Sequence, residues 1–296
     1  MIELRRILCP SDLSGYSARA LAQARRIAER RGSSLTVLHV IPTTVPTAGG
    51  FAAFTNPALL YPDVREHALS ALRRSVERTG PARLPAEVEV REGVPAEEIL
   101  KRARDLPADL LVIGTHGRGG FEKWVLGSVT ERVLRKARCP VLAVPARGAL
   151  PRGPALFDPI LWATDFSAPS TAALAHAVSL ARLDRARLLL LHVVSHASEA
   201  GEPGSRPDLA AELQERAREW LRSCVPTQVR SQCPVEEIVG VGKAHREIVR
   251  IARERGAQLI VMGAQGADAL DAMIFGSTAQ RVMKMSPCPV LTARAG

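Results

Sequence analysis

Apolar and polar residues alternate along the chain in short blocks of two kinds. Runs rich in Val, Ile and Leu have the length of buried strands, and segments with apolar residues at helical spacing follow them. This alternation is typical of a parallel sheet covered by helices on both faces. In the first half we expect strands at 6–10, 35–41, 87–92, 110–114 and 141–145, and helices at 17–31, 63–79, 95–104 and 128–136.

The second half of the chain repeats the first. ILCPSDLSGYSARALAQARRIA around Asp12 corresponds to ILWATDFSAPSTAALAHAVSLA around Asp165, at an offset of 153 residues. LGSVTERVLRKARCPVLAVPA near the end of the first half corresponds to FGSTAQRVMKMSPCPVLTARA, at an offset of 149. A period of about 150 residues has the size of a domain. We therefore predict two homologous domains, 1–147 and 156–296, joined by a Gly/Pro-rich linker near 147–159.

Each half is expected to form a doubly wound α/β domain with a five-stranded parallel sheet. The crossovers between its strands should be right-handed. In such sheets, ligands bind at the carboxyl ends of the strands, where the strand order reverses. The residues that follow the first, second and fourth strands of each half are therefore the candidates for a site.

A glycine pattern follows the fourth strand in both halves. G-x-x-G-x9-G-S runs from Gly114 to Ser128 and again from Gly263 to Ser277. Glycines let backbone amides approach an anion closely, and a helix N-terminus favours negative charge. Asp12, after the first strand, can accept from ribose hydroxyls or an adenine amino group. A lone GxxG is usually a turn and a lone Asp often caps a helix, but the full pattern, present twice, favours a phosphate-binding loop.

These segments resemble the ATP-binding branch of the universal stress protein family. The resemblance rests on DLS after the first strand, LHV in the second, and GTHGRGG, GSVTERV and CPVLAV later on, and it extends over both halves. It implies the strand order 3-2-1-4-5 and binding of ATP, with Mg²⁺ or Mn²⁺ held through the phosphates and no metal site of protein ligands. It also implies an intramolecular pseudo-dimer, in which the two domains pair through strand 5.

The resemblance implies an ATP site in each domain, when its motif is carried over position by position. The site in the first domain would consist of Pro10, Ser11, Asp12, Val40, Gly114, His116, Gly117, Arg118, Gly127, Ser128, Val129 and Thr130. The site in the second domain would consist of Ala163, Thr164, Asp165, Val193, Gly263, Gly266, Gly276, Ser277 and Thr278.

Substitutions in the second copy predict that its site is weaker. Arg118 is replaced by Ala267, and the carboxylates of Asp268 and Asp271 stand near the expected position of the phosphates. Like charges at ~8 Å repel by ~0.5 kcal/mol in water and by ~2 kcal/mol at an effective dielectric constant of 20. We therefore predict that the first domain binds ATP more tightly, by about one to two orders of magnitude.

Composition argues against several other classes of protein. No apolar run approaches the ~20 residues of a membrane helix, and the basic N-terminal segment lacks the continuous apolar core that is expected of a secretory signal. Five cysteines without CxxC spacing argue against disulfides and zinc. The first half holds 23 Lys and Arg against 15 Asp and Glu, but the low aromatic content of 4% argues against a nucleic-acid partner. A cytoplasmic protein is expected, without a membrane partner.

The sequence favours a nucleotide-dependent regulatory or stress-response module with a protein partner, either as a single chain or as a homodimer. His116 is the histidine expected near the loop, where it could assist slow hydrolysis. A slow ATPase or phosphotransferase, or a scaffold that binds proteins or nucleic acid, are the alternatives. His39 and His192 are expected in the core. The segment 43–62 is expected to be a lid, a partner-docking loop or an unstructured insertion.

Overall fold

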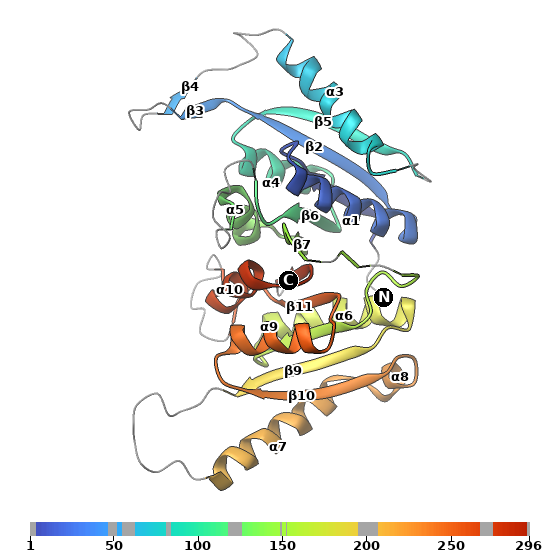
Figure 1. Ribbon diagram of the computed structural model, residues 1–296, viewed down its shortest axis with the longest axis vertical. Helices are drawn as coiled ribbons and strands as arrows, with labels where there is room; N and C mark the ends of the chain where they lie inside the picture. Colours follow the sequence, from blue (N-terminus) through green and yellow to red (C-terminus); the bar gives the residue numbers. More distant parts are fainter. Residues whose placement is uncertain are drawn as a thin grey trace. The chain divides into compact units, whose positions relative to one another are not determined.

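Two compact units make up the chain, Glu3–Ala146 and Arg147–Gly296. We call them the N-terminal and the C-terminal domain and describe each by itself (Figure 1). The structure is a computed structural model. It describes residues 4–46, 52–54, 63–80, 84–117, 126–148, 150–151, 153–194, 207–266 and 275–294.

The N-terminal domain contains a parallel five-stranded sheet in the order β5-β2-β1-β6-β7. This is the predicted order 3-2-1-4-5, which is thereby confirmed. The order reverses at β1, because β2 and β6 lie on either side of it. The strands are β1 (Arg6–Pro10), β2 (Ser34–Pro42), β5 (Ala86–Gly93), β6 (Leu110–Gly114) and β7 (Val141–Val144).

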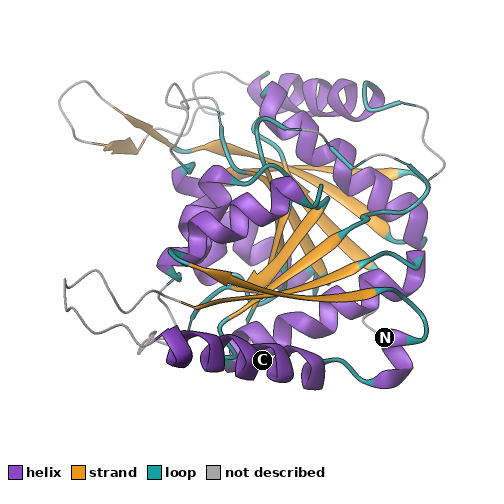
Figure 2. Cartoon of the chain, turned by 60° about the horizontal axis from the view of Figure 1, so that its bottom comes forward, coloured by secondary structure: helices purple, strands orange, loops and turns teal. Residues whose placement is uncertain are grey.

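Helices cover both faces of this sheet (Figure 2). Helix α1 (Gly15–Arg31) packs on β1 and β6, and α3 (Val64–Glu77) packs on β2 and β5. Helices α4 (Pro95–Asp105) and α5 (Ser128–Lys136) pack against each other and complete the covering. All four helices were expected from the apolar periodicity.

The C-terminal domain repeats this topology. Its parallel sheet has the order β10-β9-β8-β11-β12. The strands are β8 (Ile160–Thr164), β9 (Leu188–Val194), β10 (Val235–Val241), β11 (Leu259–Gly263) and β12 (Val290–Ala293). The helices are α6 (Ala168–Asp184), α7 (Pro207–Cys224), the short α8 (Thr227–Arg230), α9 (Ala244–Glu254) and α10 (Ser277–Met285).

The central strands form the core of each domain. Ile7 and Leu111 are fully buried in the N-terminal domain, and Trp162 is fully buried in the C-terminal one. The indole Nε1 of Trp162 donates to the carbonyl of Ser170 at 2.8 Å, so this large side chain buries no unpaired donor. None of the described helices is long and apolar enough to cross a membrane.

In two segments the structure adds detail to the sequence-based expectation. Part of the predicted linker packs with the C-terminal domain, since Leu156 and Phe157 are buried and the Leu156 amide donates to Asp184. Within 43–62, β3 (Thr44–Pro46) and β4 (Ala52–Phe54) pair as an antiparallel hairpin. The rest of that segment, 47–51 and 55–62, lies outside the described residues, so its role as a lid or docking loop stays a prediction.

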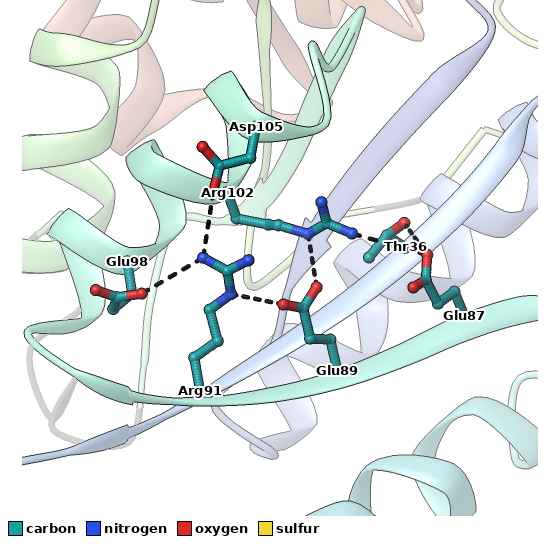
Figure 3. Close-up of polar contacts among 7 residues, drawn as sticks. All are labelled: Thr36, Glu87, Glu89, Arg91, Glu98, Arg102 and Asp105. Atoms are coloured by element: carbon teal, nitrogen blue, oxygen red, sulfur yellow. Dashed lines mark hydrogen bonds and ion pairs between the residues drawn. The ribbon is translucent and has the colours of Figure 1, made fainter.

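An ion-pair network joins the edge strand β5 to helix α4 (Figure 3). The Nε atoms of Arg91 and Arg102 each donate to the Glu89 carboxylate at 2.6 Å. Arg91 also lies 3.5 Å from Glu98 and 3.6 Å from Asp105. Partial burial would raise the pKa of Glu89, but the hydrogen bonds and charges of the two arginines outweigh it, so the pKa lies below its usual value.

Candidate functional site

A cavity of about 870 Å³ opens at the carboxyl ends of β1, β2 and β6 in the N-terminal domain. Its volume falls within the range of roughly 300–1,000 Å³ that is common for small-molecule sites. Arg118 lies outside the described residues. The other residues predicted for the first site all line this cavity, namely Pro10, Ser11, Asp12, Val40, Gly114, His116, Gly117, Gly127, Ser128, Val129 and Thr130.

The turn between β1 and α1 positions Asp12 at the cavity. Its Oδ1 accepts from the Ser14 amide at 3.0 Å and from the Ser14 hydroxyl at 2.6 Å. Ser14 itself caps the helix, because its hydroxyl oxygen accepts from the Ser17 amide at 3.2 Å. Asp12 is therefore not the cap. It orients the capping serine, and its other oxygen lies near Gly117.

The glycine pattern ties the end of β6 to the start of α5. The Gly127 amide donates to the Thr115 carbonyl at 2.9 Å, and the Thr130 hydroxyl donates to the Gly114 carbonyl at 2.8 Å. At Gly117, a Cβ atom would lie 3.0 Å from Oδ2 of Asp12. A side chain there would press on the aspartate, so glycine allows this close approach.

The hydroxyl of Thr130 binds within the protein. A hydroxyl carries one hydrogen, and in Thr130 that hydrogen is directed at the carbonyl of Gly114. The side chain is also buried. In this arrangement the Thr130 hydroxyl does not donate to a phosphate, and it holds the strand end against the helix.

The other half of the cavity is apolar and was missed by the sequence reasoning. Helix α3 contributes Val64, His67, Ala68 and Ala71, which follow the helical spacing i, i+3, i+4, i+7. This stripe is a sequence signal that could have identified the wall. The further apolar lining residues, predicted for no site, are Leu13, Leu38, Ile41, Pro42, Pro95, Ile99, Ile113 and Leu126.

Three histidines line the cavity, and His116 is the one that was expected near the glycine loop. His39 is buried as predicted, and its Nδ1 lies 2.8 Å from the carbonyl of Ser11. Because a carbonyl can only accept, Nδ1 carries the hydrogen. Nδ1 of His116 lies 2.9 Å from the hydroxyl of Thr115. His67 comes from the stripe on α3 and was predicted for no site.

The charge difference predicted between the two domains stays a prediction. The residues behind that prediction, 118–125 and 267–274, lie outside the described residues. Among those described, Glu131 lines the cavity of the N-terminal domain, 3.0 Å from Arg135. The corresponding residue of the C-terminal domain is the neutral Gln280. At this pair of positions the negative charge lies in the N-terminal domain, whereas the prediction placed the additional negative charges in the C-terminal one.

The turn and the glycine loop of the C-terminal domain make the same hydrogen bonds as their counterparts in the N-terminal domain. Asp165 Oδ1 accepts from the Ser167 amide at 3.0 Å, and a Cβ atom on Gly266 would lie 2.9 Å from Asp165 Oδ2. The Gly276 amide donates to the carbonyl of Ala264 at 2.9 Å, just before α10. Ala163 and Thr164 are buried beneath the turn, Val193 is half-buried on β9, Gly263 ends β11, and Ser277 and Thr278 begin α10.

The described residues contain no group of three or more His, Cys, Asp or Glu side chains that could hold a metal ion. Burial raises the pKa of Cys9 and of Cys288 to about 12, and that of Cys139 to about 11. A thiol ligates a metal or attacks an electrophile as the thiolate. These three thiols stay protonated near neutral pH and have the character of small apolar side chains.

Known proteins resemble both halves of the chain. The sequence pattern of the Universal stress protein family matches residues 3–145 and 156–294. A universal stress protein of Mycobacterium tuberculosis is 28% identical over 278 residues, which cover 90% of this chain and 89% of that protein. One from Methanocaldococcus jannaschii is 33% identical over 144 residues, 47% of this chain and 81% of that protein. The crystal structure of a universal stress protein from Archaeoglobus fulgidus, 25% identical, has a TM-score of 0.67 and 98% coverage of both chains.

Proposed function

Because the chain belongs to the universal stress protein family, with one family domain in each half, we propose that it is a nucleotide-dependent regulatory or stress-response module whose N-terminal domain binds ATP. The cavity of about 870 Å³ is the observation that carries this proposal, because it combines an apolar half with a glycine-rich polar half. A divalent ion, Mg²⁺ or Mn²⁺, would be held through the phosphates.

The apolar half suits a purine base. Val40, Ile41 and Ala68 are buried side chains that line it from β2 and α3. Pro95 and Ile99 line it from α4. Flat apolar walls bury the faces of a base, while polar groups at the rim fix its orientation. Asp12 lies between this half and the glycine loop, where its carboxylate can accept from ribose hydroxyls.

The polar half suits phosphate groups. The first amides of an α-helix have no partner within the helix, and together with the helix dipole they favour an anion. Ser128 and Val129 supply such amides at the start of α5, and both residues line the cavity. Gly117 leaves the loop backbone open to close approach. Backbone groups alone make these contacts, so a triphosphate could bind here without side-chain ligands.

Binding with slow or no turnover is the mode of action that we propose. Among the described residues that line the cavity, the acidic ones are Asp12 and Glu131. One Asp12 oxygen accepts from Ser14, and Glu131 pairs with Arg135. Neither is thereby poised as a general base for an attacking water. Slow hydrolysis assisted by His116 is the alternative.

A pair of matched glycine variants tests the proposal. Gly117→Val places a side chain against Asp12, and Gly266→Val makes the same change in the C-terminal domain. Calorimetric titration with ATP and Mg²⁺ should show at least a tenfold loss of affinity, about 1.4 kcal/mol, in Gly117→Val. Gly266→Val should retain the affinity of the unmodified chain for its tight site.

Two results would contradict the proposal. One is an unmodified chain that binds no ATP, and the other is Gly117→Val binding as tightly as the unmodified chain. Chromatography of the same samples after incubation measures ADP. ADP formation that is abolished in Gly117→Val would favour the slow ATPase, and a turnover of about one per second or more would be ordinary enzyme behaviour.

A further inference from the structure

Phe166 in the C-terminal domain stands where Leu13 stands in the N-terminal one. Each follows the aspartate at the end of the first strand, and each has a left-handed backbone, with φ of 65° at Leu13 and 62° at Phe166. The Leu13 amide donates to Ser11 Oγ at 3.1 Å, and the Phe166 amide donates to Thr164 Oγ1 at 2.9 Å. With the same backbone, both side chains leave the turn in the same direction.

Trp220 stands in the same way where Ala71 stands on α3. The buried Ala68 and Leu72 correspond to the buried Ala217 and Leu221 on α7, at the offset of 149 residues. Both helices pack on the second and third strands of their sheets. The residue before each buried leucine is therefore equivalent, Ala71 in one domain and Trp220 in the other.

The two larger side chains contact each other and cover the histidine beneath them. The Phe166 ring lies 4.5 Å from the His192 ring, centroid to centroid, with 31° between the planes. The Trp220 ring meets Phe166 edge-on, at 5.1 Å and 82°. His192 is equivalent to His39, since Nδ1 of each lies against the carbonyl that follows or ends the first strand.

This contact fills space that is open in the N-terminal domain, where Leu13, His39 and Ala71 all line the cavity. Two aromatic rings 4.5 Å apart are already in contact, so a planar base cannot enter between Phe166 and His192. Trp220, whose exposed fraction is 60%, covers Phe166 from the solvent side.

We propose that Phe166 and Trp220 close the base half of the site in the C-terminal domain, so that this domain excludes purine nucleotides by shape. This inference rests on the proposed function of the N-terminal cavity, which serves as its open counterpart. The inference assigns the difference in nucleotide binding between the domains to two side chains, and it does not depend on the charges near the phosphates. The two residues thus determine which domain responds to nucleotide.

Exchanging the two pairs of residues tests this directly. Phe166→Leu/Trp220→Ala gives the C-terminal domain the side chains of the N-terminal one, and Leu13→Phe/Ala71→Trp makes the reverse change. Each variant is titrated with ATP and Mg²⁺ by calorimetry, and the sites per chain are counted. We expect one site in the unmodified chain, a second and weaker site in the first variant, and at least a tenfold loss of affinity in the second.

Controls separate the possible failures. Trp220→Ala alone removes an exposed side chain, so it should fold normally, as circular dichroism and thermal unfolding will show. Two sites in the unmodified chain would overturn the inference, and so would a folded Phe166→Leu/Trp220→Ala variant that still has one site. No site in the unmodified chain would instead overturn the proposed function, and with it the open counterpart on which the inference depends.

Discussion

The two domains share a strand order, a turn after the first strand and a glycine loop, yet they fill equivalent spaces differently. Between α4 and β5, the N-terminal domain places Glu89 and Arg102 in an ion pair. At the equivalent positions the C-terminal domain has Ile238 and the buried Ile251. The two domains also differ at the carboxyl ends of the strands. There the N-terminal domain has a cavity, and the C-terminal domain has an aromatic cluster.

The comparison teaches that two domains of this fold can share the same backbone geometry and still differ in the chemistry of their sites. Asp12 and Asp165 make the same hydrogen bonds to the serine that caps the next helix. A binding motif that preserves this geometry can therefore persist in a domain whose site is closed. Function has to be argued from the side chains around the motif rather than from the motif alone.

The largest expected effect comes from truncating equivalent core leucines. Leu72 and Leu221 are both fully buried, so Leu72→Ala and Leu221→Ala should each destabilise their own domain by about 2–5 kcal/mol. At 100 times its Kd, ATP should restore about 2.7 kcal/mol to the domain that binds it. Scanning calorimetry should show this rescue for Leu72→Ala. Equal rescue of Leu221→Ala would contradict a difference between the domains.

The next effect concerns the two aspartates. Asp12→Ala removes the carboxylate beside Gly117 and the acceptor for Ser14, so ATP affinity should fall about tenfold to a hundredfold. Asp165→Ala removes the same contacts from a closed site and should leave the affinity unchanged. Equilibrium dialysis with labelled ATP measures both. Similar losses in the two variants would mean that both domains bind.

A smaller effect is expected at the edge strand. Arg102→Ala removes one of two hydrogen bonds to a half-buried carboxylate and should destabilise β5 by about 1–2 kcal/mol. Glu89→Ile/Arg102→Ile copies the apolar pair of the C-terminal domain and should be close to neutral, since apolar replacement of a buried ion pair often is. Hydrogen exchange of the β5 amides reports both. A double variant less stable than Arg102→Ala would contradict this account.

The smallest effect is a dependence on pH at the same place. The pKa of Glu89 is lowered in the folded state, so the carboxylate contributes stability above its unfolded pKa of about 4.3. That contribution falls as the pH drops below this value towards the folded pKa. Exchange of the β5 amides, corrected for its intrinsic pH dependence, should therefore lose protection below about pH 4.3. Glu89→Ile/Arg102→Ile should abolish this loss, and an unchanged profile would contradict the assignment.

Local sequence patterns predict the fold closely. Strands β1 and β6 and helix α5 have the bounds that the pattern indicated, because each is a short apolar run or stripe bordered by Pro, Gly or a polar turn. Helix α1 begins two residues earlier than expected, at Gly15, since Ser14 provides its cap. These signals lie within a few residues of the elements that they define, so no tertiary information is needed.

The polar half of the candidate site was predictable for the same reason, because Gly114, Gly117 and Gly127 form one local pattern. The apolar half was not, since it depends on how α3 packs over β2 and β5. The effect of Phe166 could not be foreseen either. A phenylalanine after a strand closes a site only if a partner such as Trp220, 54 residues later in the chain, meets it in the folded domain.

Hydrogen exchange of the full chain, with and without ATP and Mg²⁺, tests the central claim most directly because it reports each domain separately. We predict that ATP protects the turn at Asp12, the loop at Gly114–Gly117 and the first turn of α5. The equivalent amides near Asp165, at Gly263–Gly266 and at the start of α10 should exchange unchanged. Equal protection in both domains, or none in the N-terminal domain at saturating ATP, would contradict the account.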